Sequence, residues 1–548
     1  MSELTSAAFA AWQGGNLSRA ELLFRQAISL DSGDEKAHCD LVMVLYEQRR
    51  FSDALAMGAS ALSQFPQSAG IHCNIGVLCA AGNDFEAAIR HFSRAVELNP
   101  DDASASVNLV TARLQACDWE PLDRYRETLI AASDQGHDGR HQLETVPPFL
   151  AVQLGLSASL QRCIADFSSN RIVQLWPRMD LAPRPLARDK LRIAYLSSEF
   201  HERPTAFMIG SMMSLHDRQR FEVFAYSHGP DVNDTYRKKV RSGVDHFRDI
   251  RDLAHMDAAR LIAADGIDIL IDLDGHGGAG RPEIMALHPA NVSVSFLGYP
   301  GTLGAGLADY VIGDDVVSPM ADQALFGETI IALPGCYQPN ERLAQLSSTL
   351  RRDEAGLPEH ATVFCCMNAS YKISQPVFDA WMDILAACPE AVLWLLESNA
   401  AAKNKLLQRA RERNIEPIRI IFASHVPRGR HLDRLQLADV YLDTIGVCAR
   451  APAGDALRAG LPLLAVPGNS FSSRISTSLL TAAGLSDFIC EDLAEYTDQA
   501  VRFGNNSELL AAAKFRVADA INESTVFDPY DFCRKFEDAL LKIAAGEV

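Results

Sequence analysis

A spacing of about 34 residues recurs through the first hundred positions of the chain and restricts its fold more than any other feature. Small side chains return at this interval at Ala20, Ala54 and Ala88. The same interval separates the members of further sets: Ala27, Ala61 and Ala95; Leu17, Phe51 and Phe85; and Pro66 and Pro100. A repeat of this length accommodates two helices and a turn, so residues 1–120 are predicted to form an all-α solenoid.

One repeat carries the whole pattern of a tetratricopeptide repeat at the residues Gly76, Ala88, Phe92, Ala95 and Pro100. Small residues at these offsets let paired helices approach closely, and the proline ends the second helix of the pair. The concave surface of such a solenoid usually holds a peptide or protein partner. A rigid spacer or a dimerisation arm is the alternative interpretation.

The pattern changes after the repeats. Residues 121–188 are predicted to be a helical linker or capping region that ends in Ala182-Pro-Arg-Pro185. From Leu191 onward, short apolar runs alternate with helical stretches, which is typical of βαβ units and a parallel sheet. Two series of runs predict two Rossmann-like lobes, over 189–345 and over 346–548, the second including a C-terminal helix.

Charge and cysteine content exclude several classes of partner and site. The net charge is −19 with a pI of about 5.2, and no basic tract is present, so nucleic acid and anionic membrane surfaces are not expected partners. The 12 cysteines show no CxxC pair, so neither a disulfide framework nor a metal site is expected. No leader and no long apolar run is apparent, and the expected location is the cytoplasm.

Cationic side chains follow the strands of the second predicted lobe. Lys372 comes after one apolar run, and Arg428, His431 and Arg434 precede the next, spaced so that they share a face if they lie on a helix. Ligands of open α/β sheets bind beyond the carboxyl ends of the strands. The pattern therefore predicts a cleft for an anionic, phosphate-bearing ligand, although a solvated basic surface would show the same spacing.

Several segments, in this order, resemble the O-linked N-acetylglucosamine transferase family, glycosyltransferase family 41. They are Glu199 to Thr205, Asp245-His-Phe, Leu297-Gly-Tyr-Pro-Gly-Thr302, Ser370-Tyr-Lys-Ile, Gln436 to Thr444 and Pro467 to Arg474. The resemblance implies an α/β GT-B glycosyltransferase, with two Rossmann-like domains, behind the repeat solenoid. It further implies transfer of a sugar from a nucleotide donor to Ser or Thr of a protein, with no metal and no cofactor apart from the donor substrate.

The same resemblance implies site residues. Lys372 matches the lysine at the donor phosphates, where a fixed ammonium stabilises the leaving anion. His246 matches a histidine near the sugar and is the candidate proton acceptor, although a lone histidine is more often structural. The implied donor-binding residues are Arg203, Pro204, Thr205, Gly301, Thr302, Asn368, Arg428, His431, Arg434, Arg450 and Asp455.

Two positions depart from the family pattern. Arg203 stands where the family has a histidine, and Arg450-Ala-Pro-Ala-Gly-Asp455 replaces a His-Thr-Thr-Gly-x-Asp segment. Two added guanidinium forks suit a donor with one phosphate and one carboxylate, as in a CMP-nonulosonic acid (pseudaminic or legionaminic acid). Bacterial flagellin glycosyltransferases that resemble the family use such donors. UDP-N-acetylglucosamine is the competing donor, and a catalytically inactive protein-binding module is the alternative from another class.

Overall fold

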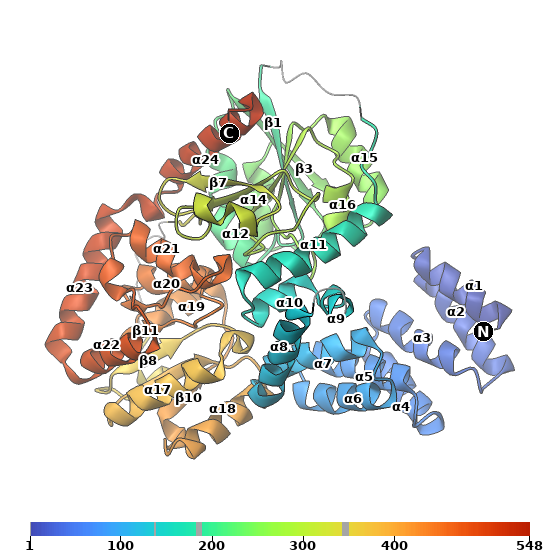
Figure 1. The fold of residues 1–548 in the computed structure, drawn as a ribbon, viewed down its shortest axis with the longest axis horizontal. Coiled ribbons are helices and arrows are strands. Elements are labelled where there is room, and N and C mark those ends of the chain that lie inside the picture. The colour runs from blue at the N-terminus through green and yellow to red at the C-terminus, as the bar shows by residue number, and fades with distance from the viewer. Residues whose placement is uncertain (1, 136–138, 182–188, 342–349, 548) are drawn as a thin grey trace. The chain divides into compact units, whose positions relative to one another are not determined.

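A computed structural model describes residues 2–135, 139–181, 189–341 and 350–547. The chain separates into two compact units (Figure 1). The first comprises Met1–Glu127 with Glu397–Arg409, and the second comprises Thr128–Leu396 with Ala410–Val548. No helix in the described ranges is long and apolar enough to cross a bilayer.

The first unit is the predicted solenoid of helix pairs. Its helices are α1 (Glu3–Gln13), α2 (Leu17–Leu30), α3 (Glu35–Glu47), α4 (Phe51–Gln64), α5 (Ala69–Ala81), α6 (Phe85–Leu98), α7 (Ala103–Gln115) and the start of α8 (Trp119–Asp134). Ala20, Ala54 and Ala88 are completely buried between helices. A Cβ atom on Gly76 would lie 2.6 Å from the ring of Phe92, so only glycine allows this approach of α5 and α6. The repeat prediction is confirmed.

A segment from far along the sequence also belongs to this first unit. The amide of Asn83 donates to the carbonyl of Ser398 over 3.0 Å, and Asn399 donates to the carbonyl of Gln115 over 2.8 Å. Both contacts involve Glu397–Arg409, which contains most of α18 (Ala400–Glu412). The unit extends to Glu127, a few residues beyond the predicted boundary at 120.

The second unit begins with the linker helices α9 (Arg140–Glu144), α10 (Pro148–Gln153) and α11 (Ala158–Leu175). Its first lobe is a parallel sheet with the order β3-β2-β1-β4-β5-β6-β7 among the described residues. The strands are β1 (Leu191–Ser197), β2 (Phe221–Ser227), β3 (His246–Asp249), β4 (Ile269–Asp272), β5 (Val292–Phe296), β6 (Tyr310–Asp314) and β7 (Thr329–Leu333). Order along the sheet reverses beside β1, which is where α/β folds of this kind bind ligands.

The second lobe is a smaller parallel sheet with the order β10-β9-β8-β11-β12 in the described ranges. Its strands are β8 (Val363–Cys366), β9 (Val392–Leu396), β10 (Ile420–Ala423), β11 (Val440–Leu442) and β12 (Leu463–Leu464). Helices α17 (Gln375–Ala387), α19 (Arg428–Leu435), α20 (Ala451–Arg458), α21 (Ile475–Ala482), α22 (Leu493–Asn505) and α23 (Ser507–Glu523) accompany them. The two predicted Rossmann-like lobes are thus present.

The last helix, α24 (Pro529–Ala545), returns to the first lobe (Figure 1). Phe532 and Phe536 pack with Phe296 of β5, at ring separations of 6.4 and 4.8 Å. Leu540 belongs to the same buried cluster. The helix was assigned from sequence to the second lobe, but its apolar face is buried against the first.

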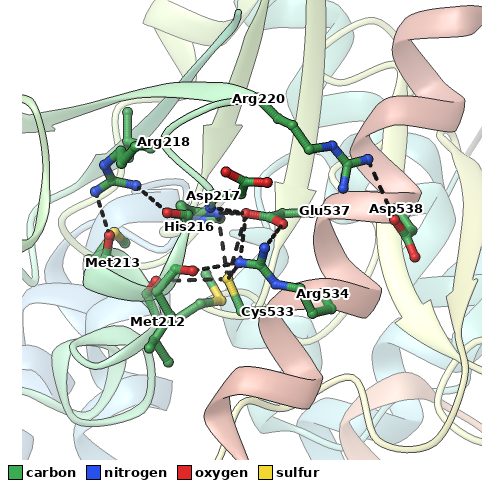
Figure 2. Close-up of polar contacts among 12 residues, drawn as sticks. Met212, Met213, His216, Asp217, Arg218, Arg220, Cys533, Arg534, Glu537 and Asp538 are labelled. Carbon is green, nitrogen blue, oxygen red and sulfur yellow. Dashed lines mark hydrogen bonds and ion pairs between the residues drawn. The ribbon is translucent and has the colours of Figure 1, made fainter.

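Figure 2 shows the polar contacts that hold α24 against residues 212–220 of the first lobe. The carboxylate of Glu537 is completely buried and accepts from the backbone N–H of Asp217 (2.8 Å), from Nδ1 of His216 (2.9 Å) and from Arg534 (3.1 Å). Burial lowers the pKa of His216, so its imidazole is neutral, and its other nitrogen contacts the hydroxyl of Tyr195 at 2.8 Å. Glu537 is therefore neutralised by Arg534 and held by several donors.

Removing this buried charge should loosen α24. Glu537→Gln places an amide NH2 against the guanidinium of Arg534, which itself donates, and it leaves Arg534 without its counter-ion. We expect the free energy of unfolding of the second unit to fall by about 3 kcal/mol, measured by urea unfolding. Asp538→Asn, on the same helix, is the control because Asp538 is 67% exposed and 3.8 Å from Arg220. Equal effects of the two substitutions would contradict the assigned role of Glu537.

Candidate active site

The carboxyl ends of β8 and β11, which are neighbours in the sheet, meet at a buried aspartate. Asp443 directly follows β11 and accepts from the backbone N–H groups of Thr444 and Ala449, both at 2.8 Å. Asn368, which follows β8, donates to Asp443 and Thr444. These contacts fix the loop that leads into α20. The amide of Asn368 is thus engaged in holding this loop.

Lys372 lies beside that loop. It ends a short 3-10 helix, and its ammonium donates to the carbonyl of Cys448 over 2.8 Å. Cys448 precedes α20 by three residues, so the ammonium is close to the N-terminus of that helix. A helix N-terminus carries a partial positive charge and free N–H groups, and a neighbouring ammonium adds a full charge. The structure therefore provides the cationic group that the phosphate prediction requires.

Arg428 and Asp455 form a bidentate ion pair. The guanidinium of Arg428 donates to both carboxylate oxygens, at 2.7 and 2.8 Å, and Arg458 adds a contact of 2.8 Å. The face of Phe207, in α12 (Pro204–Ile209), lies 4.3 Å from the guanidinium carbon of Arg428. Asp455 is 2% exposed, so its predicted contact with ribose hydroxyls would require one of these arginines to move.

His431 and Arg434 contact each other on α19, as their spacing predicts. Arg434 donates to Nδ1 of His431 over 3.0 Å and to the carbonyl of Ser424 over 2.5 Å. Burial, with the charge of Arg434 as a further cause, lowers the pKa of His431 to about 4. The imidazole is therefore neutral at physiological pH and accepts a hydrogen bond from Arg434.

A pocket of about 420 Å³ opens beside these residues. Its walls include Trp394 in the middle of β9, Phe422, Ser424, Val426 and Arg434. Nε1 of Trp394 and Nε of Arg434 are buried donors with no acceptor among the described residues. Buried N–H groups normally have partners, so these two point to a ligand with acceptor atoms. The sequence analysis missed Trp394, because a tryptophan within an apolar run is indistinguishable from a core residue.

Arg203 and its neighbours lie at the start of α12, across from α20. The N–H of Thr205 already donates to the carboxylate of Glu199 over 3.2 Å, so it is not available to a phosphate. Thr205 is also buried. Pro204 is the first residue of the helix and has no N–H to offer. The side chain of Arg203, in contrast, has no hydrogen-bonding or ion-pair partner in the described part of the chain.

The side chain of Arg450 crosses to the first lobe. Its Nη1 donates to the carbonyls of Leu297 and Gly298, both at 2.7 Å. Arg450 was predicted to present a two-pronged fork to the donor. One nitrogen of that guanidinium group, Nη1, is instead hydrogen-bonded to the backbone that follows β5.

Gly301 and Thr302 lie in the loop after β5 of the first lobe. The hydroxyl of Thr302 donates to the buried carboxylate of Glu328 over 2.6 Å. Gly301 lies against Val152 and Gln161 of the linker helices. Thr302 is thus held within the first lobe and Gly301 lies beside the linker helices, and the contact of this pair with the donor sugar, which the resemblance implies, stays a prediction.

His246 belongs to the first lobe, whereas Lys372 and the cationic residues of α19 belong to the second lobe. It is the first residue of β3, and its Nε2 lies 2.9 Å from the carboxylate of Glu222, which also binds Arg192. Its ring stacks on Phe224 at 4.3 Å. Ligands bind at the opposite, carboxyl end of a parallel strand. In the structure His246 lies with Glu222 and Arg192 in a row of charged side chains nearer the amino ends of the strands, and its catalytic role stays a prediction.

One cluster of potential metal ligands lies among the described residues. His216, Cys533 and Glu537 are the group of three whose ligand atoms lie close enough together to hold an ion. The group lies on α24 and next to it, in the first lobe, and Arg534 already balances the charge of Glu537. His216 and Glu537 are joined by the contact described above.

Two Rossmann-like lobes with a cationic cluster at the strand ends define the GT-B class of glycosyltransferases. The glycosyl transferase family 41 profile matches residues 116–341 and 338–536, and a tetratricopeptide repeat profile matches 7–69, 39–103 and 74–118. The chain belongs to glycosyltransferase family 41.

Relatives agree with this assignment. The chain is 33% identical over 361 residues to the probable UDP-N-acetylglucosamine–peptide N-acetylglucosaminyltransferase SEC of Arabidopsis thaliana, covering 65% of this chain and 37% of that protein. It is 27% identical over 547 residues to the corresponding enzyme of Caenorhabditis elegans, covering 77% and 47%. The chain thus spans less than half the length of these relatives.

A solved structure matches nearly the whole chain. A mutant of the Thermobaculum terrenum O-GlcNAc transferase aligns with a TM-score of 0.72 and 25% identity, over 99% of this chain and 96% of that one. This match supports the arrangement of a repeat solenoid followed by a GT-B transferase.

Proposed function

We propose that the protein is an O-glycosyltransferase that moves a sugar from a nucleotide donor to a Ser or Thr hydroxyl of a protein. The observation that carries the proposal is the ammonium of Lys372 beside the N-terminus of α20. As the acceptor oxygen bonds to the anomeric carbon and gives up its proton to solvent, the bond from that carbon to the donor phosphate breaks. Negative charge then grows on the leaving phosphate, where a preorganised ammonium lowers the barrier.

We place the nucleoside of the donor in the pocket beside α19. A nucleobase offers carbonyl oxygens and ring nitrogens, which are the acceptors that Trp394 and Arg434 lack. The volume of about 420 Å³ is adequate for a nucleoside. Neutral His431 provides a flat ring next to Arg434.

Nucleotide binding tests this placement. Trp394→Phe removes the indole N–H but keeps an aromatic wall, and it should weaken nucleotide binding about fivefold, the value of one hydrogen bond of about 1 kcal/mol. Trp381→Phe is the matched control, because Trp381 donates within the core to Tyr496 over 3.0 Å. Calorimetry that shows equal affinities for the two variants would contradict the placement.

Two donors are proposed, each on a different observation. UDP-N-acetylglucosamine is favoured by the names of the relatives, and by Arg450, whose fork is partly engaged by backbone carbonyls. A CMP-nonulosonic acid is favoured by Arg203, a cation without a partner among the described residues. Calorimetry with UDP, CDP and CMP separates the two. Tight UDP binding with none for cytidine nucleotides supports the first donor, and the reverse supports the second.

The repeats are proposed to recruit the protein acceptor, with a flagellin-type acceptor as the specific candidate if the donor is a nonulosonic acid. The regular solenoid of α1 to α7 supports recruitment, since solenoids offer an extended concave surface. We also propose that catalysis needs no metal ion and that it takes place in the cytoplasm. An inactive binding module is disfavoured because Lys372 and the loop organised by Asp443 are both in place.

A further inference from the structure

We infer that Arg450 is a positioning residue that ties the second lobe to the loop after β5 of the first lobe, instead of a ligand of the donor. The inference rests on the proposed transfer reaction only for its kinetic readout. Nη1 of Arg450 donates to two consecutive carbonyls, of Leu297 and Gly298, at 2.7 Å each. A single nitrogen thus makes both contacts.

The backbone that Arg450 binds has a conformation that few sequences adopt. Leu297 has φ +65°, in the left-handed region, which is unfavourable for a bulky side chain. A Cβ atom on Gly298 would lie 1.3 Å from the carbonyl oxygen of Leu273, so only glycine fits there. Such a conformation persists only where its surroundings enforce it. The two hydrogen bonds from Arg450 are part of that enforcement.

The other end of Arg450 is also fixed. It is the N-cap residue of α20, and its carbonyl accepts from the amide of Gln338 over 3.4 Å. Its side chain therefore connects the start of α20, next to Lys372, with the loop after β5, and its carbonyl connects it with the segment after β7. A change in this connection would shift the groups of one lobe relative to the other, and misplacement by about 1 Å can cost about 100-fold in rate.

Substitution by lysine separates positioning from donor binding. A lysine ammonium has three donors and can make both carbonyl contacts, but it has no planar fork for a carboxylate or phosphate. We expect Arg450→Lys to keep kcat within about threefold, and Arg450→Met to lower kcat about 100-fold. The dissociation constant for nucleotide should stay within about threefold in both. Hydrogen exchange of the peptide containing Leu297 and Gly298 should accelerate in Arg450→Met only.

Arg419 is the matched control, because it also donates to backbone carbonyls, those of Ala391, Leu385 and Cys388. Arg419→Met should leave kcat and exchange at Leu297 unchanged. Equal losses of kcat in the lysine and methionine variants, or nucleotide binding weakened tenfold or more in both, would overturn the inference. If Arg450→Met does not fold, Arg450→Lys alone decides, by its kcat and its nucleotide affinity. If the wild-type protein transfers no sugar, the proposed function fails, and unchanged exchange in Arg450→Met would still refute the positioning role.

Discussion

Replacing Lys372 with alanine is expected to lower the rate of sugar transfer by about 100- to 1,000-fold, the usual cost of losing one preorganised charge at a developing anion. Within the described residues the ammonium donates to a loop carbonyl at 2.8 Å, so its loss should leave the fold intact. Because the charge matters most when the phosphate leaves, kcat should fall more than nucleotide affinity. Single-turnover transfer with a saturating donor measures this directly.

Lys514→Ala provides the control for this experiment. Lys514 lies in the same lobe, but it pairs with Asp439, which precedes β11 and is therefore at the amino end of the sheet. Its removal should not change the rate. A folded Lys372→Ala variant with near-normal turnover would refute the assignment of the phosphate site.

Removing the repeats, residues 1–115, is expected to abolish modification of the protein acceptor while nucleotide binding persists. The solenoid contributes the extended surface of this chain, and the family 41 profile begins only at residue 116. The removed helices contact Glu397–Arg409, so that segment will lose its partners. Pull-down of the acceptor and calorimetry with nucleotide test the two halves of the prediction.

A second variant separates loss of recruitment from damage to the transferase. Asn399→Ala breaks the contact with Gln115 but leaves the solenoid in the chain, and it should retain acceptor binding. Undiminished acceptor modification by the truncated chain would show that the transferase lobes recruit the acceptor themselves.

The architecture could be predicted because it depends on periodic patterns of small and apolar residues in the sequence. The alanines at Ala20, Ala54 and Ala88 are completely buried, as a helix-pair repeat requires. Most strands of both sheets were visible as apolar runs. β3, β6 and β7 were not among the predicted strands; β3 was missed because His-Phe-Arg-Asp has too little apolar character to stand out and its strand is only partly buried.

The site was only partly predictable because spacing does not report what a side chain contacts. In the structure Lys372 follows β8, while Arg428, His431 and Arg434 lie on α19 after β10, and their contact with the donor stays a prediction. The direction of Arg450 and Thr302 depended on backbone carbonyls and on Glu328, which are distant in sequence. The position of His246 at the start of β3 could not be predicted, because a motif match carries no information on which end of a strand a residue occupies.

The most direct test of the central claim is intact-mass analysis of a candidate acceptor protein after co-expression with this chain and a nucleotide-sugar pathway. The account predicts an added mass equal to one or more sugar residues, present with the wild-type protein and absent with Lys372→Ala. The size of the increment also identifies the donor sugar. An acceptor that binds the repeats but remains unmodified in the presence of either proposed donor would contradict the account and leave a protein-binding module as the function.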